Sequence, residues 1–371
     1  MSLEAFGATA CFTDYTGNLP RSNKELADWH RGVPQDAVLD PRMPIVDAHH
    51  HLFGSLQDRL FYRLEDLHQD IDCGHRVIGS VYVEAYESGW RSAGPESLRP
   101  VGEVEKIEQI TRWPDAPSDD SCRVAAGIVS YADLTLGHAV GEVLDQQIAA
   151  GEGRLRGVRY RTATDTGTVG KLIDHPPRPR LLGETAFRQG FSELAPRGLS
   201  FDAWVYHTQL RELLELADTF PQTTIVLNHV GGPIGVAEYR SKRDEVLGQW
   251  TRGMRDLAAR PNIRVKIGGM GMAVFGFGFE RKDRPAKSSE LVAAWRPSIE
   301  TCIGLFGTER CMFESNFPVD KQTCSYAELW NAFKACTQGL AFEHRQNLFY
   351  RTACQTYRLT ELEQLGNRLC T

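Results

Sequence analysis

Three consecutive histidines, His49 to His51, are the residues whose type and spacing most directly suggest chemistry in this chain. They follow the apolar run 44–46 and Asp47, a pattern that indicates a buried strand whose C-terminal end opens into a polar site. Alternate side chains of an extended backbone share a face, so we expect His49 and His51 to project together while His50 points elsewhere. Such a pair can clamp a divalent metal. An exposed histidine loop, or core histidines satisfied by hydrogen bonds, would give the same sequence.

Other polar residues stand at the ends of later apolar runs. The runs are 77–84, 124–130, 155–160, 199–206, 224–228, 263–267 and 311–315, and the polar residues at or near their ends are Glu84, Arg159, Arg161, His207, His229, Lys266, Glu314 and Asn316. The two arginines alternate on one face, where they could bind a substrate carboxylate through paired hydrogen bonds or form an internal ion-pair network. Lys266 is a third candidate for substrate binding, and Glu84 could either bind substrate or pair with Arg159.

Helical segments separate most of these runs, which predicts an alternating α/β fold. The expected helices are 101–112, 136–150, 187–195, 210–220, 239–258, 290–306, 326–337 and 343–357. Eight strand and helix units suit a closed (β/α)8 TIM barrel, whose catalytic groups lie at the strand C-termini. A doubly wound open sheet would instead gather its polar groups near one switch point. We therefore predict a barrel at 44–371, preceded by an irregular N-terminal arm at 1–43.

Composition limits the classes of function. The 371 residues are 42% hydrophobic and 24% charged, which fits a soluble globular protein, and the net charge of -6 gives no basic surface for nucleic acid. The nine cysteines contain no C-x-x-C pair and are expected to be reduced thiols. No signal peptide or membrane span is apparent, so we expect a cytoplasmic protein without membrane partners. Its expected partner is a small molecule, and homo-oligomer formation stays open.

The chain resembles the amidohydrolase-2 group of the amidohydrolase superfamily, TIM-barrel metal-dependent hydrolases that include sugar lactonases and 2-pyrone-4,6-dicarboxylate lactonase. The resemblance runs from about residue 44 to 359, and its motifs are VDAHHHLF, LRGVRY, the stretch 198–233, NIRVKIGGM and MFESNFPVD. It implies one divalent metal, Zn²⁺ first among the choices, bound by His49, His51 and His207. It also implies a metal or substrate contact for His229. In metal-free lactonases of the family the first pair would instead polarise the substrate.

The last motif departs from the family, which typically has Asp where this chain has Asn316. That Asp would be the general base, and a carboxamide cannot accept the proton of the attacking water. Glu314 on the same face could take over as base, as could His51 or His229. We expect a hydrolase that opens a lactone or similar cyclic ester of an acidic small molecule. A decarboxylase or hydratase on the same barrel, or a binding pseudoenzyme without its base, are the alternatives.

Overall fold

In the computed structural model, which describes residues 15–112, 121–173 and 175–370, the strands form one parallel sheet in chain order. The strands are β1 (Ile45–His50), β2 (Val77–Val83), β3 (Arg123–Ser130), β4 (Leu155–Arg161), β5 (Ser200–Trp204), β6 (Ile225–Leu227), β7 (Ile263–Ile267) and β8 (Cys311–Phe313). Just beyond β8, the chain returns to β1. His50 bridges Phe317, and the Asn316 N–H donates to the His49 carbonyl at 2.9 Å. This contact closes the ring, and the predicted (β/α)8 barrel is confirmed.

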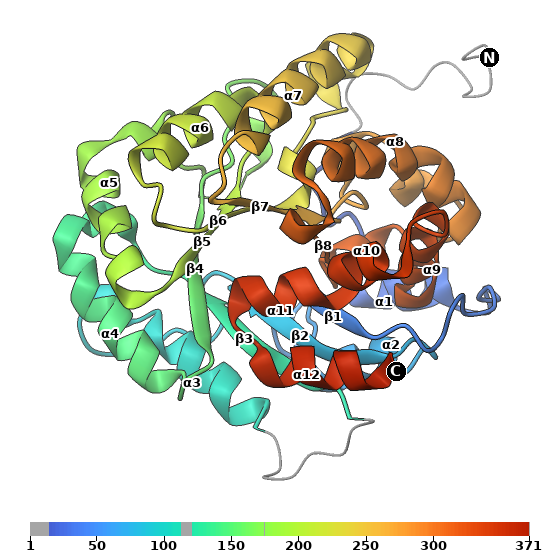
Figure 1. Cartoon of the computed structure of the whole chain (residues 1–371), viewed down its shortest axis with the longest axis horizontal. Helices are drawn as coiled ribbons and strands as arrows, with labels where there is room; N and C mark the ends of the chain where they lie inside the picture. The colour runs from blue at the N-terminus through green and yellow to red at the C-terminus, as the bar shows by residue number, and fades with distance from the viewer. Residues whose placement is uncertain (1–14, 113–120, 174, 371) are drawn as a thin grey trace.

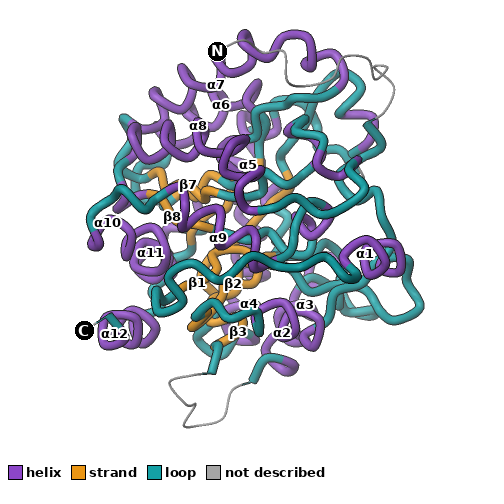
Figure 2. Tube along the Cα trace, turned by 90° about the vertical axis from the view of Figure 1, so that its right-hand side faces the viewer, coloured by secondary structure: helices purple, strands orange, loops and turns teal. Residues whose placement is uncertain are grey.

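Helices cover the outside of the barrel (Figures 1 and 2). They are α2 (Leu64–Ile71), α3 (Val101–Ile110), α4 (Val140–Ala150), α5 (Thr185–Ser192), α6 (Leu210–Thr219), α7 (Arg243–Ala258), α8 (Ser288–Phe306) and α9 (Tyr326–Cys336). The segment predicted as one helix at 343–357 is α10 (Phe342–Gln346), a π-helical turn (Asn347–Arg351) and α11 (Thr352–Tyr357). The sequence did not predict α2 or α12 (Thr360–Leu369). None of the described helices is long and apolar enough to cross a membrane.

The C-terminal helices fill one end of the barrel. Side chains of α11 and α12, among them Tyr357 and Leu362, pack with inward-facing residues of the strands, and both helices lie in front of the strands in Figure 1. Leu362 lies against Gly79 near the start of β2, where a Cβ would be 2.4 Å from a Leu362 methyl carbon. The N-terminal ends of the strands are therefore closed by apolar packing, which leaves their C-terminal ends for a site.

A buried ion pair lies between that apolar plug and the C-terminal ends of the strands. Lys266 of β7 donates to the Asp202 carboxylate of β5 at 2.6 Å, and both side chains are fully buried. The Tyr357 hydroxyl donates to the same carboxylate at 2.9 Å, so α11 is tied to the barrel interior through Asp202. Lys266 was predicted to bind substrate, but its ammonium group is enclosed and paired.

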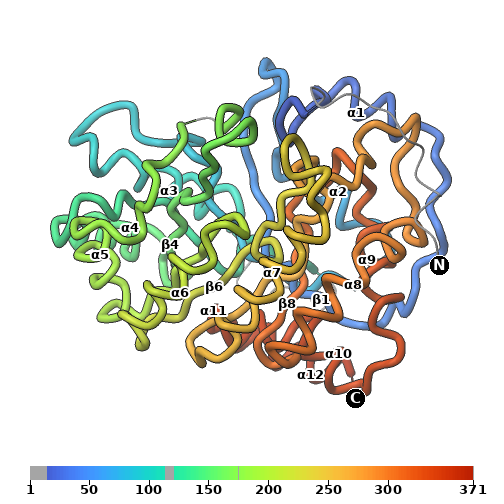
Figure 3. Tube along the Cα trace, turned by 90° about the horizontal axis from the view of Figure 1, so that it is seen from above, coloured from blue at the N-terminus to red at the C-terminus, as the bar shows by residue number. Residues whose placement is uncertain are grey.

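The described part of the N-terminal arm, 15–43, runs outside α8 and α9 (Figure 3). Its helix α1 (Asn23–His30) is capped by the Ser22 side chain. Before α1, Asn18 accepts the Val274 N–H at 3.0 Å, and within α1 the Trp29 indole donates to the Lys282 carbonyl at 2.9 Å. The arm therefore holds the loop 268–288 that follows β7.

We predict that Lys266→Met lowers the free energy of unfolding by about 3–5 kcal/mol, because it leaves the Asp202 carboxylate buried without its cation. Chemical denaturation of both proteins at pH 7 measures the difference. Lys321→Met is the matched control: its ammonium pairs with Asp70 at 2.7 Å, but its side chain is 26% exposed. The control should lose no more than about 1 kcal/mol. Equal losses in the two variants would contradict the prediction.

Candidate functional site

Six side chains from five strand ends meet at the C-terminal end of the barrel. His49 and His51 come from β1, and the others are Glu84 after β2, Arg159 in β4, His229 after β6 and Glu314 after β8. These side chains are at most 6% exposed. Buried polar groups need partners, because an unpaired one costs the full free energy of its lost hydration. The partners of each ring nitrogen therefore fix where its proton lies.

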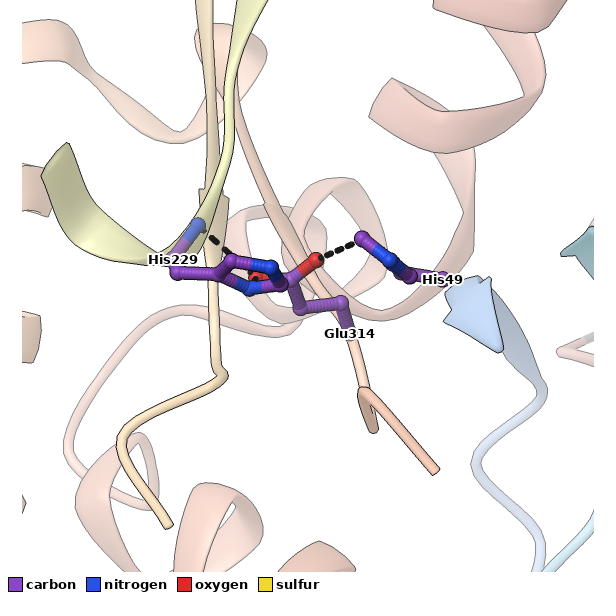
Figure 4. A group of neighbouring side chains, drawn as sticks. All are labelled: His49, His229 and Glu314. Atoms are coloured by element: carbon purple, nitrogen blue, oxygen red, sulfur yellow. Dashed lines mark hydrogen bonds and ion pairs between the residues drawn. The ribbon is translucent and has the colours of Figure 1, made fainter. Parts of the chain in front are cut away.

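Glu314 joins two of the imidazoles (Figure 4). One carboxylate oxygen lies 2.8 Å from Nδ1 of His49, and the other lies 2.7 Å from Nδ1 of His229. The second oxygen also accepts the His229 backbone N–H at 3.0 Å. The His229 contact is a hydrogen bond, and because a carboxylate only accepts, Nδ1 of His229 carries the proton. The His49 contact has an ion-pair distance without hydrogen-bond geometry. Arg159 Nη1, a donor, lies 3.2 Å from Nε2 of His49, so this ring also keeps its lone pair on Nε2 and its proton on Nδ1.

His51 has the same tautomer for a different reason. Its Nδ1 lies 2.9 Å from the Val83 carbonyl oxygen, which can only accept, so the proton is on Nδ1. The Nε2 atoms of His49 and His51 lie 3.1 Å apart, and both present lone pairs. Two ligands at about 2.0–2.1 Å from a tetrahedral zinc would be about 3.3 Å apart, and metal-binding imidazoles usually donate their other N–H to a carboxylate or carbonyl. The pair therefore fits a divalent cation.

A second grouping of ligand atoms overlaps with this pair. His49, His229 and Glu314 each place one ligand atom within 4.8 Å of the others. The Glu314 oxygens, however, already face the Nδ1 atoms of both rings, so this carboxylate is more suited to orient the imidazoles than to bind a cation. His51 with His49 is the better candidate metal pair.

Arg159 lies against the same pair. Its Nη1 is 3.2 Å from Nε2 of His49, its Nε donates to the Glu84 carboxylate at 2.6 Å, and its Nη2 donates to the Glu84 carbonyl at 2.8 Å. Arg161 comes within 3.7 Å of the same carboxylate, so the internal ion-pair network is present. A cation on His49 would compete with the Arg159 guanidinium for the Nε2 lone pair.

Burial makes the three imidazoles neutral. It lowers the pKa of His49 and His51 well below the usual histidine value, and nearby cations, Lys266 and Arg159 among them, act in the same direction. The pKa of His229 is also lowered by burial, although Glu314 opposes the shift. Near pH 7 all three rings can therefore accept a proton or bind a metal through Nε2.

Two glycines make room for this arrangement at the end of β7. A Cβ on Gly269 would lie 2.3 Å from Nδ1 of His229, and a Cβ on Gly268 would lie 2.3 Å from the Glu314 carbonyl oxygen. His229 itself has φ of 52°, in the left-handed region that few residues with a Cβ adopt. The local sequence thus allows a close approach that any larger residue would block.

The side chain of Asn316 binds Asp320. Its amide donates to the Asp320 carboxyl at 2.8 Å, and the other oxygen of Asp320 accepts the Gly271 N–H at 2.8 Å. An Asp at 316 would place two buried carboxyl groups at hydrogen-bonding distance. The amide of Asn316 avoids this pairing of acids, because it can donate a hydrogen bond to Asp320. The sequence interpretation missed Asp320, whose one signal is its position four residues after Asn316.

His207 lies apart from the clustered histidines. Its Nδ1 accepts the Ile234 N–H at 3.4 Å, its ring contacts Tyr239, and its Nε2 has no hydrogen-bond partner among the described residues. That contact places the proton on Nε2, which suits a donor better than a metal ligand. As the third ligand of a metal held by His49 and His51, His207 stays a prediction.

Comparisons with known proteins identify the family of this chain. The family model described as amidohydrolase matches residues 46–359, and the chain therefore belongs to the amidohydrolase family. An uncharacterised protein of Sinorhizobium fredii, y4mH, is 31% identical over 337 residues, which cover 87% of this chain and 99% of that protein. An L-fucono-1,5-lactonase of Burkholderia multivorans is 26% identical over 244 residues, 65% of this chain and 74% of that protein.

A solved structure shares the fold. It is an amidohydrolase from Burkholderia multivorans with bound zinc, which superposes with a TM-score of 0.63 at 21% identity and covers 85% of this chain and 99% of its own. The described arm at 15–43 lies outside the part matched by the family model. The chain is thus a member of the amidohydrolase family that shares sequence similarity with an L-fucono-1,5-lactonase.

We predict that Asp320→Asn flattens the pH dependence of stability between about pH 6.5 and 8. Burial, helped by Glu314, raises the pKa of Asp320 to about 8. The folded protein then holds a proton that the unfolded chain releases near pH 4, so stability falls as pH rises to about 8. One such carboxyl contributes up to about 1.4 kcal/mol per pH unit.

Urea denaturation at several pH values measures this slope. Asp218→Asn is the control: Asp218 is exposed and pairs with Arg260, which lowers its pKa, so its loss should leave the slope above pH 6.5 unchanged. Glu103, whose pKa burial raises to about 7, should keep part of the slope in the Asp320 variant. An unchanged slope in that variant would contradict the assignment.

Proposed function

We propose that this protein hydrolyses a lactone or similar cyclic ester of an acidic small molecule. The observation that carries the proposal is the buried Glu314 carboxylate, which orients the imidazoles of His49 and His229 by their Nδ1 atoms. The similarity to L-fucono-1,5-lactonases of two Burkholderia species supports the reaction class. Opening a lactone needs a base for water, a group that stabilises the developing oxyanion and a donor for the leaving oxygen.

His229 is the base in this proposal. Its Nδ1–H donates to Glu314, so Nε2 can take a proton from the water as the water oxygen bonds to the lactone carbonyl carbon. The imidazolium is stabilised by the Glu314 carboxylate, as in other carboxylate–histidine pairs. When the ring C–O bond breaks, the same proton passes to the departing ring oxygen, and the product is a hydroxy acid. Water and lactone are the only reactants.

Glu314 is less suited to be the base itself. Both of its oxygens are within 2.8 Å of imidazole Nδ1 atoms, and one also accepts a backbone N–H at 3.0 Å. Oxygens that already face two imidazole nitrogens and a backbone N–H have little lone-pair capacity left for the attacking water. We therefore assign Glu314 to positioning, and Asn316 to holding the loop after β8 through Asp320.

A divalent cation, zinc first among the choices, would be held by His49 and His51. When bound, it would polarise the substrate carbonyl and stabilise negative charge on its oxygen. Arg159 lies beside Nε2 of His49 and carries a fixed positive charge toward the same place. Glu84 keeps that guanidinium in position through Nε and Nη2.

We predict that Glu314→Gln lowers kcat on a hydrolysed lactone by about 10² to 10⁴ with a small change in KM. A Gln side chain presents one acceptor and one donor to two N–H groups, so one imidazole must change tautomer and lose its orientation. Steady-state kinetics on a panel of carboxylated lactones measures the effect. Glu328→Gln is the control, since this buried carboxylate of α9 accepts the backbone N–H groups of Asp36 and Ser288 and pairs with Lys287, not with the histidines of the site.

The lactone panel, together with a second panel of aromatic carboxylic acids, separates the alternatives. A wild-type protein that turns over no lactone but releases CO₂ from aromatic carboxylic acids would be a decarboxylase on this barrel. A wild type inert towards both sets would favour the binding pseudoenzyme. A Glu314→Gln variant as active as the wild type would remove Glu314 from the mechanism.

We predict that the purified protein contains about one equivalent of divalent metal and that His49→Ala loses most of it, because the variant removes one of two converging Nε2 lone pairs. Elemental analysis by mass spectrometry measures the metal content. His138→Ala is the control, since that ring is 65% exposed and pairs with Glu193 on the surface. Full metal content in His49→Ala would contradict the clamp, whereas metal-free active wild type would favour polarisation by Arg159.

A further inference from the structure

Four aromatic side chains form a continuous group on the loops of the catalytic face. Tyr86 and Trp90 follow β2, Tyr131 follows β3, and Tyr160 lies near the end of β4. Their ring centroids lie 4.9 Å apart for Tyr86 and Trp90, 5.2 Å for Tyr86 and Tyr131, and 5.5 Å for Tyr131 and Tyr160. We call these four residues the aromatic wall. Offset and edge contacts at such distances give a rigid surface.

The aromatic wall is less enclosed than the rings of the core. Tyr86, Trp90 and Tyr160 are half-buried and Tyr131 is 8% exposed, whereas Phe187 and Phe201 behind them are fully buried. Among the ring contacts of the described residues, Tyr160 links the wall to this core, with its ring 5.9 Å from Phe187. The loop rings therefore keep apolar surface that the fold does not cover, which is the property of a ligand-binding surface.

Arg161 stands at the edge of the aromatic wall. Its guanidinium carbon lies 5.0 Å from the centroid of the Tyr86 ring, and its Nε is 3.7 Å from the Glu84 carboxylate. The side chain is 37% exposed, and its guanidinium makes no side-chain hydrogen bond among the described residues. Arg159, two residues earlier, is 6% exposed and directs Nε, Nη1 and Nη2 to Glu84 and His49. Of the two, Arg161 has donors available for a ligand.

Glu84 connects the aromatic wall with the reaction site. One oxygen binds Arg159 and faces Arg161, and the other accepts the Tyr86 backbone N–H at 2.8 Å. Arg159 in turn contacts His49. A molecule lying on the wall with an anionic group at Arg161 would therefore reach toward the histidines from the side of β2 to β4.

We propose that the aromatic wall and Arg161 form a substrate subsite for a carboxylate carried on a flat, unsaturated ring. The ring would lie against the wall, and the carboxylate would accept paired N–H groups of Arg161. The inference rests on the proposed function and deepens it, because it names the substrate class and assigns the carboxylate to Arg161. Arg159 then acts on the reacting end of the molecule.

Binding of inert ring acids tests this subsite without turnover. The probes are benzoate, cyclohexanecarboxylate and benzyl alcohol, titrated calorimetrically into the wild type, Arg161→Gln, Arg161→Lys and Trp90→Leu. Arg211→Gln is the matched control, because that guanidinium is 90% exposed on α6. Thermal melts check that each variant is folded. Lactone turnover by the wild type is measured separately.

We expect benzoate to bind the wild type more tightly than the other two probes. Arg161→Gln should weaken benzoate at least about tenfold, since it removes hydrogen bonds to a charged group, and Arg161→Lys should recover part of that loss. Trp90→Leu should weaken benzoate more than cyclohexanecarboxylate. Arg211→Gln should match the wild type.

The subsite is overturned if folded Arg161→Gln binds benzoate as the wild type does, or if Arg211→Gln loses as much affinity. Equal wild-type affinity for benzoate and cyclohexanecarboxylate would overturn the role of the flat ring, and no benzoate binding would overturn the whole subsite. Benzoate binding lost in Arg161→Gln, with no lactone hydrolysed by the wild type, would keep the subsite and reject the proposed hydrolase function.

Discussion

The Glu314 carboxylate is the contact on which the reaction site depends. It lies between the imidazoles of His49 and His229, which come from β1 and β6 on either side of it. One oxygen accepts the Nδ1–H of His229, and the other lies 2.8 Å from Nδ1 of His49, whose Nε2 faces an N–H of Arg159. Both rings therefore keep their Nε2 lone pairs for chemistry. The Val83 carbonyl fixes the proton of His51 on Nδ1. All three neutral rings therefore have the proton on Nδ1 and the lone pair on Nε2.

The barrel makes this contact possible because it packs fully buried polar groups close together. Gly268 and Gly269 allow the end of β7 to pass close to Glu314 and His229, where a side chain would collide. Below them, Lys266 and Asp202 neutralise each other, and Tyr357 adds a hydrogen bond from the C-terminal helices. Burial of the three imidazoles lowers their pKa and keeps them unprotonated near neutral pH.

The two arginines of β4 differ in burial, and this difference separates their proposed roles. Both face Glu84, but Arg159 is enclosed beside His49 whereas Arg161 stays half-exposed against Tyr86. A fixed internal charge suits stabilisation of a developing oxyanion, because it needs no reorganisation during the reaction. An accessible charge suits recognition of a substrate carboxylate. The same residue type thus supports both catalysis and binding in the proposed mechanism.

The sequence alone determined the barrel, since its eight apolar runs end in polar residues all round the chain. It also determined that His49 and His51 lie together, because alternation along a strand follows from backbone geometry. Four outcomes depended on tertiary structure: the tautomers set by Glu314 and Val83, the enclosure of Lys266, the position of His207, and the partnership of Asn316 with Asp320. Most of these outcomes depend on contacts between residues that are far apart in the chain. Loop conformation and the closure of the barrel decide which of those side chains meet.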